Sequence, residues 1–452
     1  MFRSLKIRGL SATIEKWENH WANALLDTDL EFLVFEAHCN HVRLPIGFFT
    51  LGPEFCTGTQ FRGAPSQVYP SAWAHVLAMC SKLAKCGISV LIDMHALPGS
   101  ANESSHSGTT ASFANLWGSP YYLGFAEKCI LFVAREIAAG KIPNCAGFQI
   151  CNEAIWQAKG MYDFYANMLF KISEIDISIP IYISDAWNLG ATVDWIQRYN
   201  TTSSRTNLMI IDTHEYYTFD EKHTSKTPPQ LLGLVSAALK AADHVSGNVH
   251  RYGAVPLYVG EYSCVMDRKS WSDTLPRERA ILTQMFGLRQ CRTWLDKACG
   301  SAFWTLKMDW MPGGDWGFVE QTRKHCIEAP GHLSLQWDEV TRRIAEAEVR
   351  KSQIWQKAVV THNNYWDDIQ TGEQYEHWRF EDGWNDGWND ALAFFGMRKA
   401  CRVGVQGGDK IGCLDGWIRK RLVEARQLDR YGWEYEHGFR DGVKEAEVIL
   451  LR

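Results

Sequence analysis

The feature that most constrains the fold is a regular alternation of short apolar runs and longer amphipathic segments between about residues 40 and 345. The apolar runs carry β-branched or aromatic residues, which is typical of strands buried on both faces. They are His41–Leu44, Ser89–Asp93, Gly147–Ile150, Ile181–Ser184, Leu208–Asp212, Leu257–Val259 and Ala302–Leu306. The amphipathic segments predict helices at Ser71–Lys85, Tyr121–Ala139, Met161–Ile175, Pro229–Val245 and Arg277–Leu295. Such a series predicts parallel strands joined by right-handed crossovers.

Two architectures accommodate this series, a closed (β/α)8 barrel and an open doubly wound sheet. A barrel needs an eighth strand; either Leu5–Leu10 is a shortened first strand or the chain lacks one. In a barrel, all C-terminal strand ends open onto one face, whereas a single open sheet would spread its polar strand ends along an edge. The polar residues that follow the predicted strands are Arg43, Asp93 with His95, Asn152 with Glu153, Asp185, His214, Glu261 and Lys307. They favour an α/β fold of the (β/α)8 TIM barrel type.

The character of the sequence changes after about residue 350. Residues 351–452 contain seven tryptophans and an internal repeat, in which Phe380–Ala391 matches Tyr435–Ala446. Each copy has two glycines four residues apart, which form a smooth stripe on one face of a helix and let two helices approach closely. We predict a catalytic domain over 1–350 and a helical extension over 351–452. The two copies are expected to pack as a helical hairpin, with Gly404–Gly416 as the connection.

The composition excludes several classes of protein. Lys plus Arg total 47 against 52 for Asp plus Glu, so there is no basic excess for binding nucleic acid. No run approaches the roughly 20 apolar residues of a membrane helix. The charged segment Met1–Leu10 does not resemble a signal peptide. Thirteen scattered cysteines suggest reduced thiols, and together these features favour a cytoplasmic over a secreted protein. The oligomeric state is left open.

Two glutamates follow buried strands and are candidates for acid–base chemistry. Glu153 lies at the end of a buried strand within Gly147–Ala154, and Glu261 lies at the end of another within Tyr258–Ser263. Cleavage of an acetal needs a protonated carboxyl for the leaving oxygen and a carboxylate for the developing oxocarbenium ion. No HxH or HxxxH grouping indicates a metal site, and a carboxylate pair needs no cofactor.

Six segments in order resemble glycoside hydrolase family 5, in its exo-β-1,3-glucanase-like branch, which is common in fungi. They are His41–Gly47, Ile92–Ser100, Gln149–Glu153, Asp212–Tyr216, Val259–Ser263 and Phe303–Lys307. The resemblance implies a retaining (β/α)8 enzyme in which Glu153 is the general acid/base and Glu261 the nucleophile. The family normally begins with a strand and a Gly-rich loop, for which this sequence has little room before Glu15–Trp21.

The resemblance also assigns residues around the substrate. Asn152 would bind the sugar 2-hydroxyl, and Arg43 would hold the nucleophile ionised. His214 and Tyr216 would orient the two carboxylates. His95 would line the sugar subsite, and Trp304 would form a flat platform for the ring at the cleavage point.

The sequence therefore predicts a retaining β-glycosidase that hydrolyses a β-glucan or another β-glucoside. One alternative within the family is a β-glucosidase acting on a glycolipid, steryl glucoside or flavonoid glycoside. An alternative from another class is a carbohydrate-binding barrel that has lost turnover. The sequence does not distinguish exo from endo cleavage.

Overall fold

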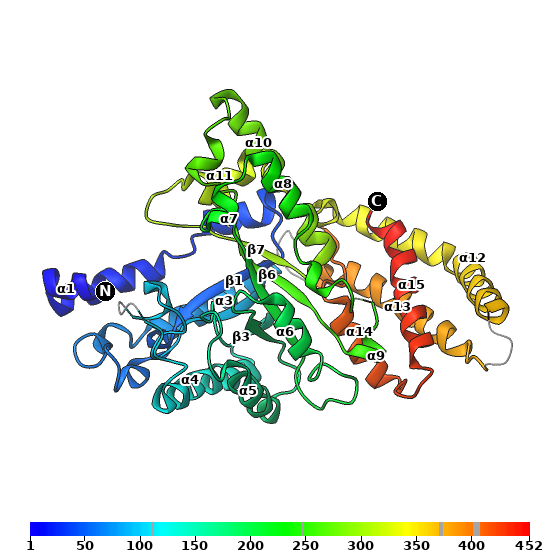
Figure 1. The fold of residues 1–452 in the computed structure, drawn as a ribbon, viewed down its shortest axis with the longest axis horizontal. Coiled ribbons are helices and arrows are strands. Elements are labelled where there is room, and N and C mark those ends of the chain that lie inside the picture. Colours follow the sequence, from blue (N-terminus) through cyan, green and yellow to red (C-terminus); the bar gives the residue numbers. More distant parts are fainter. Residues whose placement is uncertain (110–112, 246, 370–373, 401–406) are drawn as a thin grey trace. The chain divides into compact units, whose positions relative to one another are not determined.

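The structure is a computed structural model that describes residues 1–109, 113–245, 247–369, 374–400 and 407–452 (Figure 1). The chain forms two compact units, which are treated separately below. The first consists of Met1–Thr192 with Arg205–His214, and the second of Val193–Ser204 with Glu215–Arg452.

Seven strands follow one another in the sheet in sequence order, as expected of consecutive β/α units. They are β1 (His41–Gly47), β2 (Ser89–Ala96), β3 (Cys145–Gln149), β4 (Ile181–Ser184), β5 (Met209–Glu215), β6 (Leu257–Tyr262) and β7 (Ser301–Phe303). Every pair with a defined register is parallel. All seven predicted strands are confirmed, with ends that differ by a few residues. The continuous apolar runs identified them because most of these strands are buried on both faces.

The first unit holds β1 to β4 and most of β5. Its helices are α1 (Phe2–Ala22), α2 (Asp27–Glu31), α3 (Ala72–Lys85), α4 (Pro120–Ala138) and α5 (Met161–Ile175). The predicted helices at α3, α4 and α5 are confirmed. Local chemistry fixes the start of α4, where Ser119 accepts a hydrogen bond from the backbone N–H of Tyr122 and Pro120 occupies the first turn.

The reading of Leu5–Leu10 as a short first strand is wrong, because this segment lies inside α1. A run of six residues is too short to distinguish a period of two from a period of 3.6. The segment is also broken at Gly9, whose φ of 76° interrupts the helix. The alternative, that the chain lacks this first strand, agrees with the described residues.

The second unit contains the rest of the chain. Its helices are α6 (Leu189–Ile196, shared with the first unit), α7 (Glu221–Thr224), α8 (Pro228–Ser236), α9 (Val249–Tyr252), α10 (Pro276–Lys297), α11 (Phe318–Arg323), α12 (Trp337–Ile369), α13 (Trp378–Phe395), α14 (Leu414–Glu424) and α15 (Gly432–Leu450). The helix predicted over Pro229–Val245 is shorter, since α8 ends at Ser236 and Leu239 adopts a φ of 61°. None of the described helices is long and apolar enough to cross a membrane.

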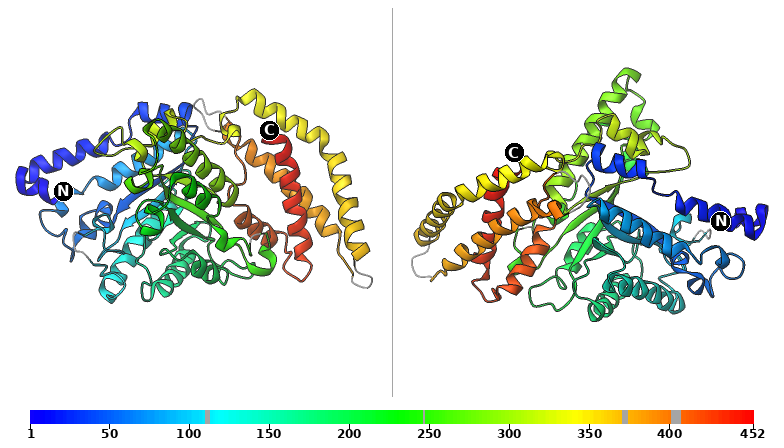
Figure 2. Two further views of the ribbon diagram at one scale, coloured as in Figure 1. Left: turned by 45° about the horizontal axis from the view of Figure 1, so that its top comes forward. Right: turned by 180° about the vertical axis from the view of Figure 1, so that it is seen from behind.

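The two copies of the repeat form α13 and α15, which run side by side (Figure 2, orange and red). A Cβ on Gly383 would lie 2.1 Å from the backbone oxygen of Tyr435, and one on Gly442 would lie 2.1 Å from that of Trp384. The other two glycines of the repeat, Gly387 and Gly438, face backbone oxygens equally closely. The predicted close approach of the two helices is therefore confirmed.

The connection between the copies differs from a simple turn. Residues 404–406 of the predicted connection Gly404–Gly416 lie outside the described residues, and α14 begins at Leu414. The two repeat helices are thus joined through a further helix. The domain boundary predicted at residue 350 falls within α12, and the division into 1–350 and 351–452 stays a prediction.

Candidate active site

Arg43 on β1 is the buried centre of a polar network in the first unit. The parallel register pairs Arg43 with Leu91 and Pro45 with Asp93, which brings the polar ends of β1 and β2 to similar heights. Nη2 of Arg43 lies 3.0 Å from Oδ2 of Asp93, with both side chains almost fully buried. Nε of Arg43 donates to Oε1 of Gln149 at 3.0 Å. A buried guanidinium with several acceptors is held rigidly, because each N–H fixes the plane of the fork.

Asn152 follows β3, and its amide is oriented by the same arginine. Nη2 of Arg43 donates to Oδ1 of Asn152 at 2.7 Å. Because arginine has donors only, the amide oxygen must face it, which leaves Nδ2 pointing elsewhere. Nδ2 of Asn152 is buried and has no hydrogen-bond partner. The position predicted to bind the sugar 2-hydroxyl therefore holds an unused buried donor.

Glu153 carries the candidate acid/base carboxyl, and two histidines hold it. Its Oε1 lies 2.9 Å from Nδ1 of His214 and its Oε2 lies 3.0 Å from Nε2 of His106. Its backbone has a φ of 40°, and the next N–H, that of Ala154, donates to Oγ of Ser184 at the end of β4. Such a left-handed conformation at a non-glycine residue persists only where the surroundings hold it, and it often marks a functional site.

The protonation of Glu153 depends on these histidines. Burial by itself raises the pKa of the Glu153 carboxyl, but hydrogen bonds from His106 and His214 outweigh burial and hold the pKa well below its usual range. His214 also contacts a second carboxylate, since its Nε2 lies 3.0 Å from Oδ2 of Asp212 on β5. Nε2 of Gln149 donates to the same oxygen of Asp212 at 2.6 Å. Because Gln149 also contacts Arg43, the imidazole of His214 connects Glu153 to the Arg43 network.

His95, at the end of β2, belongs to the same cluster. Its Nδ1 lies 2.8 Å from Oδ2 of Asp93, and its side chain is 12% exposed. Its ring centroid lies 5.2 Å from that of His106. The first unit thus brings together four of the predicted residues, Arg43, His95, Asn152 and His214, with Glu153.

The second unit contains the other candidate carboxyl. Glu261 on β6 is 4% exposed, and its Oε2 accepts a hydrogen bond from the hydroxyl of Tyr216 at 2.8 Å. Tyr216 lies directly after β5 and is two residues beyond His214. Each of the two predicted orienting residues therefore contacts one of the two glutamates.

Trp304 follows β7, and its backbone N–H donates to the carbonyl of Tyr262 at 2.9 Å. Its indole is partly exposed, as a sugar platform requires. Aromatic residues near Tyr216 add to this surface: Phe219 and Trp316 stack with ring centroids 6.0 Å apart, and Phe219 is 69% exposed.

Sequence reasoning missed three residues of this polar network and its surroundings. His106 lies in the Ser-rich loop after β2, where no periodicity marks it. Gln149 reads as an ordinary strand residue. Trp187 is 49% exposed and its ring lies edge-on to His214 with centroids 6.2 Å apart. Its place shortly after β4 is the one signal that could have identified it.

The chain has two N-glycosylation sequons, Asn102–Ser104 and Asn200–Thr202, and the first of them also belongs to this cluster. Nδ2 of Asn102 donates to the backbone oxygen of Glu153 at 2.8 Å, so that this amide is used internally. Asn200, in the other sequon, is fully buried and donates to the carbonyl of Ala254 at 2.8 Å. Both side chains have structural roles that a glycan would remove.

Comparison with known proteins supports the resemblance over most of the chain. Residues 347–450 match the family model of the glucan 1,3-beta-glucosidase 3 C-terminal domain. Glucan 1,3-beta-glucosidase 3 of Schizosaccharomyces pombe is 28% identical over 458 residues, covering 99% of this chain and 88% of that protein. An uncharacterized glycosyl hydrolase of Saccharomyces cerevisiae is 27% identical over 444 residues, covering 94% of this chain and 79% of that protein.

Solved structures support the predicted fold. The crystal structure of a rutinosidase from Aspergillus niger matches with a TM-score of 0.53 at 14% identity, covering 68% of this chain and 84% of that chain. With the sequence order of the seven strands, this likeness confirms the TIM-barrel class, here with a helical region at the C-terminal end. These comparisons support a β-glycosidase, and the chain is similar to glycoside hydrolase family 5 in its exo-β-1,3-glucanase-like branch.

Proposed function

We propose that the chain hydrolyses β-1,3-glucan or a related β-glucoside with retention of configuration, using Glu153 as acid/base and Glu261 as nucleophile. The observation that carries this proposal is that two residues of one short segment, His214 and Tyr216, each contact a different candidate glutamate. His214 contacts Glu153 and Tyr216 contacts Glu261. Residues two apart in extended chain lie about 7 Å from each other and point to the same face. Retention of configuration requires two carboxyls about 5–5.5 Å apart, one acting as acid/base and the other as nucleophile.

The contact between Glu153 and His214 suits proton transfer. If Nε2–H of His214 donates to Asp212, then a proton must lie between Nδ1 of His214 and Oε1 of Glu153, on one atom or the other. With the proton on Glu153, the carboxyl is the acid that the first step needs. With the proton on His214, the carboxylate is the base that the second step needs.

The reaction then proceeds in two displacements. In the first, the carboxylate of Glu261 attacks the anomeric carbon while Glu153 gives its proton to the glycosidic oxygen, which departs as an alcohol. In the second, Glu153 takes a proton from water, whose oxygen attacks the anomeric carbon and releases Glu261. The free Nδ2 of Asn152 would donate to the sugar 2-hydroxyl throughout.

The substrate is inferred from the relatives. The Schizosaccharomyces pombe relative is named a glucan 1,3-beta-glucosidase, and it matches nearly the whole chain. Laminarin and aryl β-glucosides are therefore the first substrates to test. Glycolipids, steryl glucosides and flavonoid glycosides are the second group, and a change of aglycone alone leaves the two glutamate roles unaltered.

Azide rescue distinguishes the two roles. Glu153→Ala and Glu261→Ala should both lose nearly all activity toward an aryl β-glucoside. Azide should restore activity to both, giving a β-glucosyl azide with Glu153→Ala and an α-glucosyl azide with Glu261→Ala. Glu215→Gln is a matched control, since this glutamate lies between His214 and Tyr216 but accepts a hydrogen bond from Tyr217 instead.

Two outcomes would contradict the assignment. Full activity in either alanine variant would show that the replaced glutamate is not catalytic. An α-glucosyl azide from Glu153→Ala and a β-glucosyl azide from Glu261→Ala would mean that the two roles are exchanged. A wild-type protein that binds laminarin without releasing glucose would favour the alternative of a binding barrel without turnover.

We propose separately that the protein is located in the cytoplasm. The twelve described cysteines form no disulfide with one another, which suits the reducing cytoplasm that the composition suggests. Fractionation of cells that express the full chain tests it: recovery in the culture medium would contradict a cytoplasmic location.

A further inference from the structure

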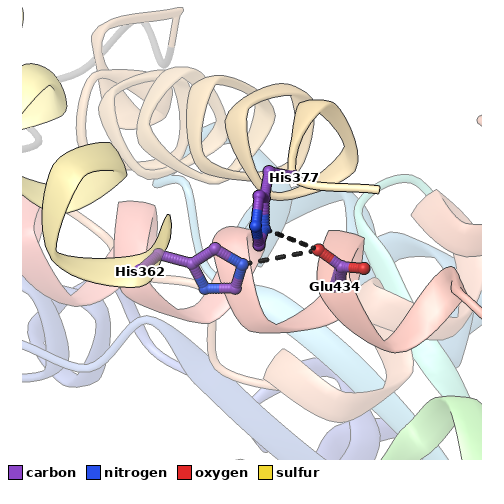
Figure 3. Close-up of side chains that lie close together, drawn as sticks. All are labelled: His362, His377 and Glu434. Carbon is purple, nitrogen blue, oxygen red and sulfur yellow. Dashed lines mark hydrogen bonds and ion pairs between the residues drawn. The ribbon is translucent and has the colours of Figure 1, made fainter. Parts of the chain in front are cut away.

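Three potential metal ligands meet in the C-terminal helical region. His362 comes from α12, His377 is the residue before α13, and Glu434 lies in the first turn of α15 (Figure 3). Their ligand atoms all lie within 4.8 Å of one another. The side chains of His362 and Glu434 are 1% and 0% exposed, and that of His377 is 19% exposed.

The spacing of these atoms suits a shared ion better than direct hydrogen bonds. Nε2 of His362 lies 3.4 Å from Oε2 of Glu434, and Nδ1 of His377 lies 3.3 Å from the same oxygen. A good N–H···O bond is shorter, about 2.9–3.0 Å. Two ligands of a tetrahedral zinc ion, each about 2.0–2.1 Å from the metal, are about 3.3–3.4 Å apart.

The hydrogen-bonding pattern points the same way. Nδ1 of His377 is buried and makes no hydrogen bond, although it faces Glu434. Nε2 of the same ring lies 3.1 Å from Oδ1 of Asp367. An imidazole that gives one nitrogen to a carboxylate and keeps the other free is the usual arrangement of a metal-bound histidine. The remaining oxygen of Glu434 accepts the backbone N–H of Glu376 at 2.8 Å, which fixes the carboxylate.

The charge of this cluster also calls for a cation. Glu434 is fully buried, and within the described part of the chain its ion-pair partners are the two histidines. A buried carboxylate is costly unless a positive charge compensates it. A divalent ion would supply that charge while both imidazoles stay neutral, the form in which they bind metals.

We propose that His362, His377 and Glu434 bind a divalent transition metal ion of the zinc class. Two imidazole nitrogens and one carboxylate oxygen suit zinc, whereas calcium and magnesium prefer oxygen ligands throughout. The ion would tie α12 and the start of α13 to α15, which makes it a structural clip for the helical region. His362 and His437 line a groove of about 900 Å³, which offers a path for the ion and room for a water as fourth ligand.

His437 is a neighbouring histidine that could also complete the site. Its ring centroid lies 5.2 Å from that of His362.

Metal uptake by the full-length protein tests the proposal directly. The protein is stripped with a chelator, dialysed, and titrated with Zn²⁺ in a calorimeter, and the bound metal is then measured by elemental analysis. We expect about one ion per chain and a rise in the melting temperature, since a ligand that binds only the folded state stabilises it. Co²⁺ in place of Zn²⁺ should give the visible absorption of a tetrahedral N/O site.

Two variants and one control make the test specific. His377→Gln changes the most exposed ligand and is expected to keep the fold, while Glu434→Gln removes the charge from the centre. Both should lose the stoichiometric binding and the thermal shift. His325→Gln is the matched control, because His325 forms an exposed pair with Glu328 and should leave binding unchanged.

Either of two results would overturn the proposal. One is the absence of saturable uptake by the wild-type chain, which would leave a protonated histidine–glutamate cluster. The other is uptake that survives both ligand variants. Because the readout is metal content and not hydrolysis, a failure here is distinct from a failure of the proposed glycosidase roles.

Discussion

Nδ1 of His214 lies 2.9 Å from Oε1 of Glu153, and the other nitrogen of that imidazole faces Asp212 at 3.0 Å. A ring between two carboxylates can donate to both only as an imidazolium. With a neutral ring, the carboxyl group that faces the unprotonated nitrogen must carry a proton, and this is Glu153 when Nε2–H donates to Asp212. In the proposed mechanism, His214 is a positioning residue that lets Glu153 alternate between acid and base.

His214→Gln should therefore impair hydrolysis most where the leaving group needs a proton. We expect kcat/KM for an alkyl β-glucoside to fall by about 10²–10⁴-fold, the usual contribution of general acid catalysis. Hydrolysis of dinitrophenyl β-glucoside should lose far less in its first step, because that leaving group departs without protonation. Measuring both substrates in parallel separates this role from a structural one, since misfolding would lower both rates equally.

Asn152→Ala tests the unused buried donor. A contact with the 2-hydroxyl that strengthens in the transition state is worth several kcal/mol. The variant should thus lower kcat by at least about a hundredfold on a glucoside. On a 2-deoxyglucoside, which lacks this hydroxyl, wild type and variant should react at similar rates. An equal loss on both substrates would show that Asn152 acts by holding Arg43 in place.

Asp185 gives a prediction for the pH dependence of stability. Burial, only partly offset by hydrogen bonds from Thr213 and the backbone of Trp187, raises the pKa of Asp185 to about 6. The folded state therefore holds this proton more tightly than the unfolded chain, where the pKa is about 3.9. The contribution of Asp185 to stability is fully present below pH 4 and is lost as the pH rises through 6. It amounts to about 3 kcal/mol for a shift of two pKa units.

Asp185→Asn removes this titration. The unfolding free energy of the variant relative to wild type, measured by urea denaturation at several pH values, should change between pH 4 and pH 6 and be constant above 7. A difference that does not vary with pH would mean that Asp185 is ionised in the folded protein at all these values.

The sequence predicted the strands because a buried strand has a short-range pattern, and it predicted the candidate site residues from their places at strand ends. A buried parallel strand is a continuous apolar run, and the residue at its C-terminal end is placed by the strand itself. Glu153, His214 and Glu261 were found in this way. His106 was not, because its loop has no periodicity, and only the folded chain brings it 3.0 Å from Glu153.

The proposed metal cluster could not be predicted from the sequence for a related reason. The sequence shows no HxH or HxxxH grouping, from which we expected no metal ligands. His362, His377 and Glu434 belong to three separate helical segments, and only the packing of α12, α13 and α15 brings them together. Motifs such as HxH and HxxxH detect metal ligands that lie on one helix or strand, but they miss ligands that come from several.

The glycine stripe allows the last prediction, on the stability of the helical region. A methyl group at Gly383 or Gly442 would lie 2.1 Å from a backbone oxygen of the opposite helix, so α13 and α15 would have to separate. Overpacking of this kind costs about 1–3 kcal/mol, and more where the opposing atom is backbone that cannot rotate away. Gly233→Ala on α8 is the matched control, because no atom lies within 4 Å of its Cβ position and the substitution should stabilise the helix by up to about 1 kcal/mol. Thermal unfolding of the three variants should therefore give a lower melting temperature for Gly383→Ala and Gly442→Ala and an unchanged or higher one for Gly233→Ala. If the two stripe variants melted like the control, the interlocked contact between the repeat helices would not be present in solution.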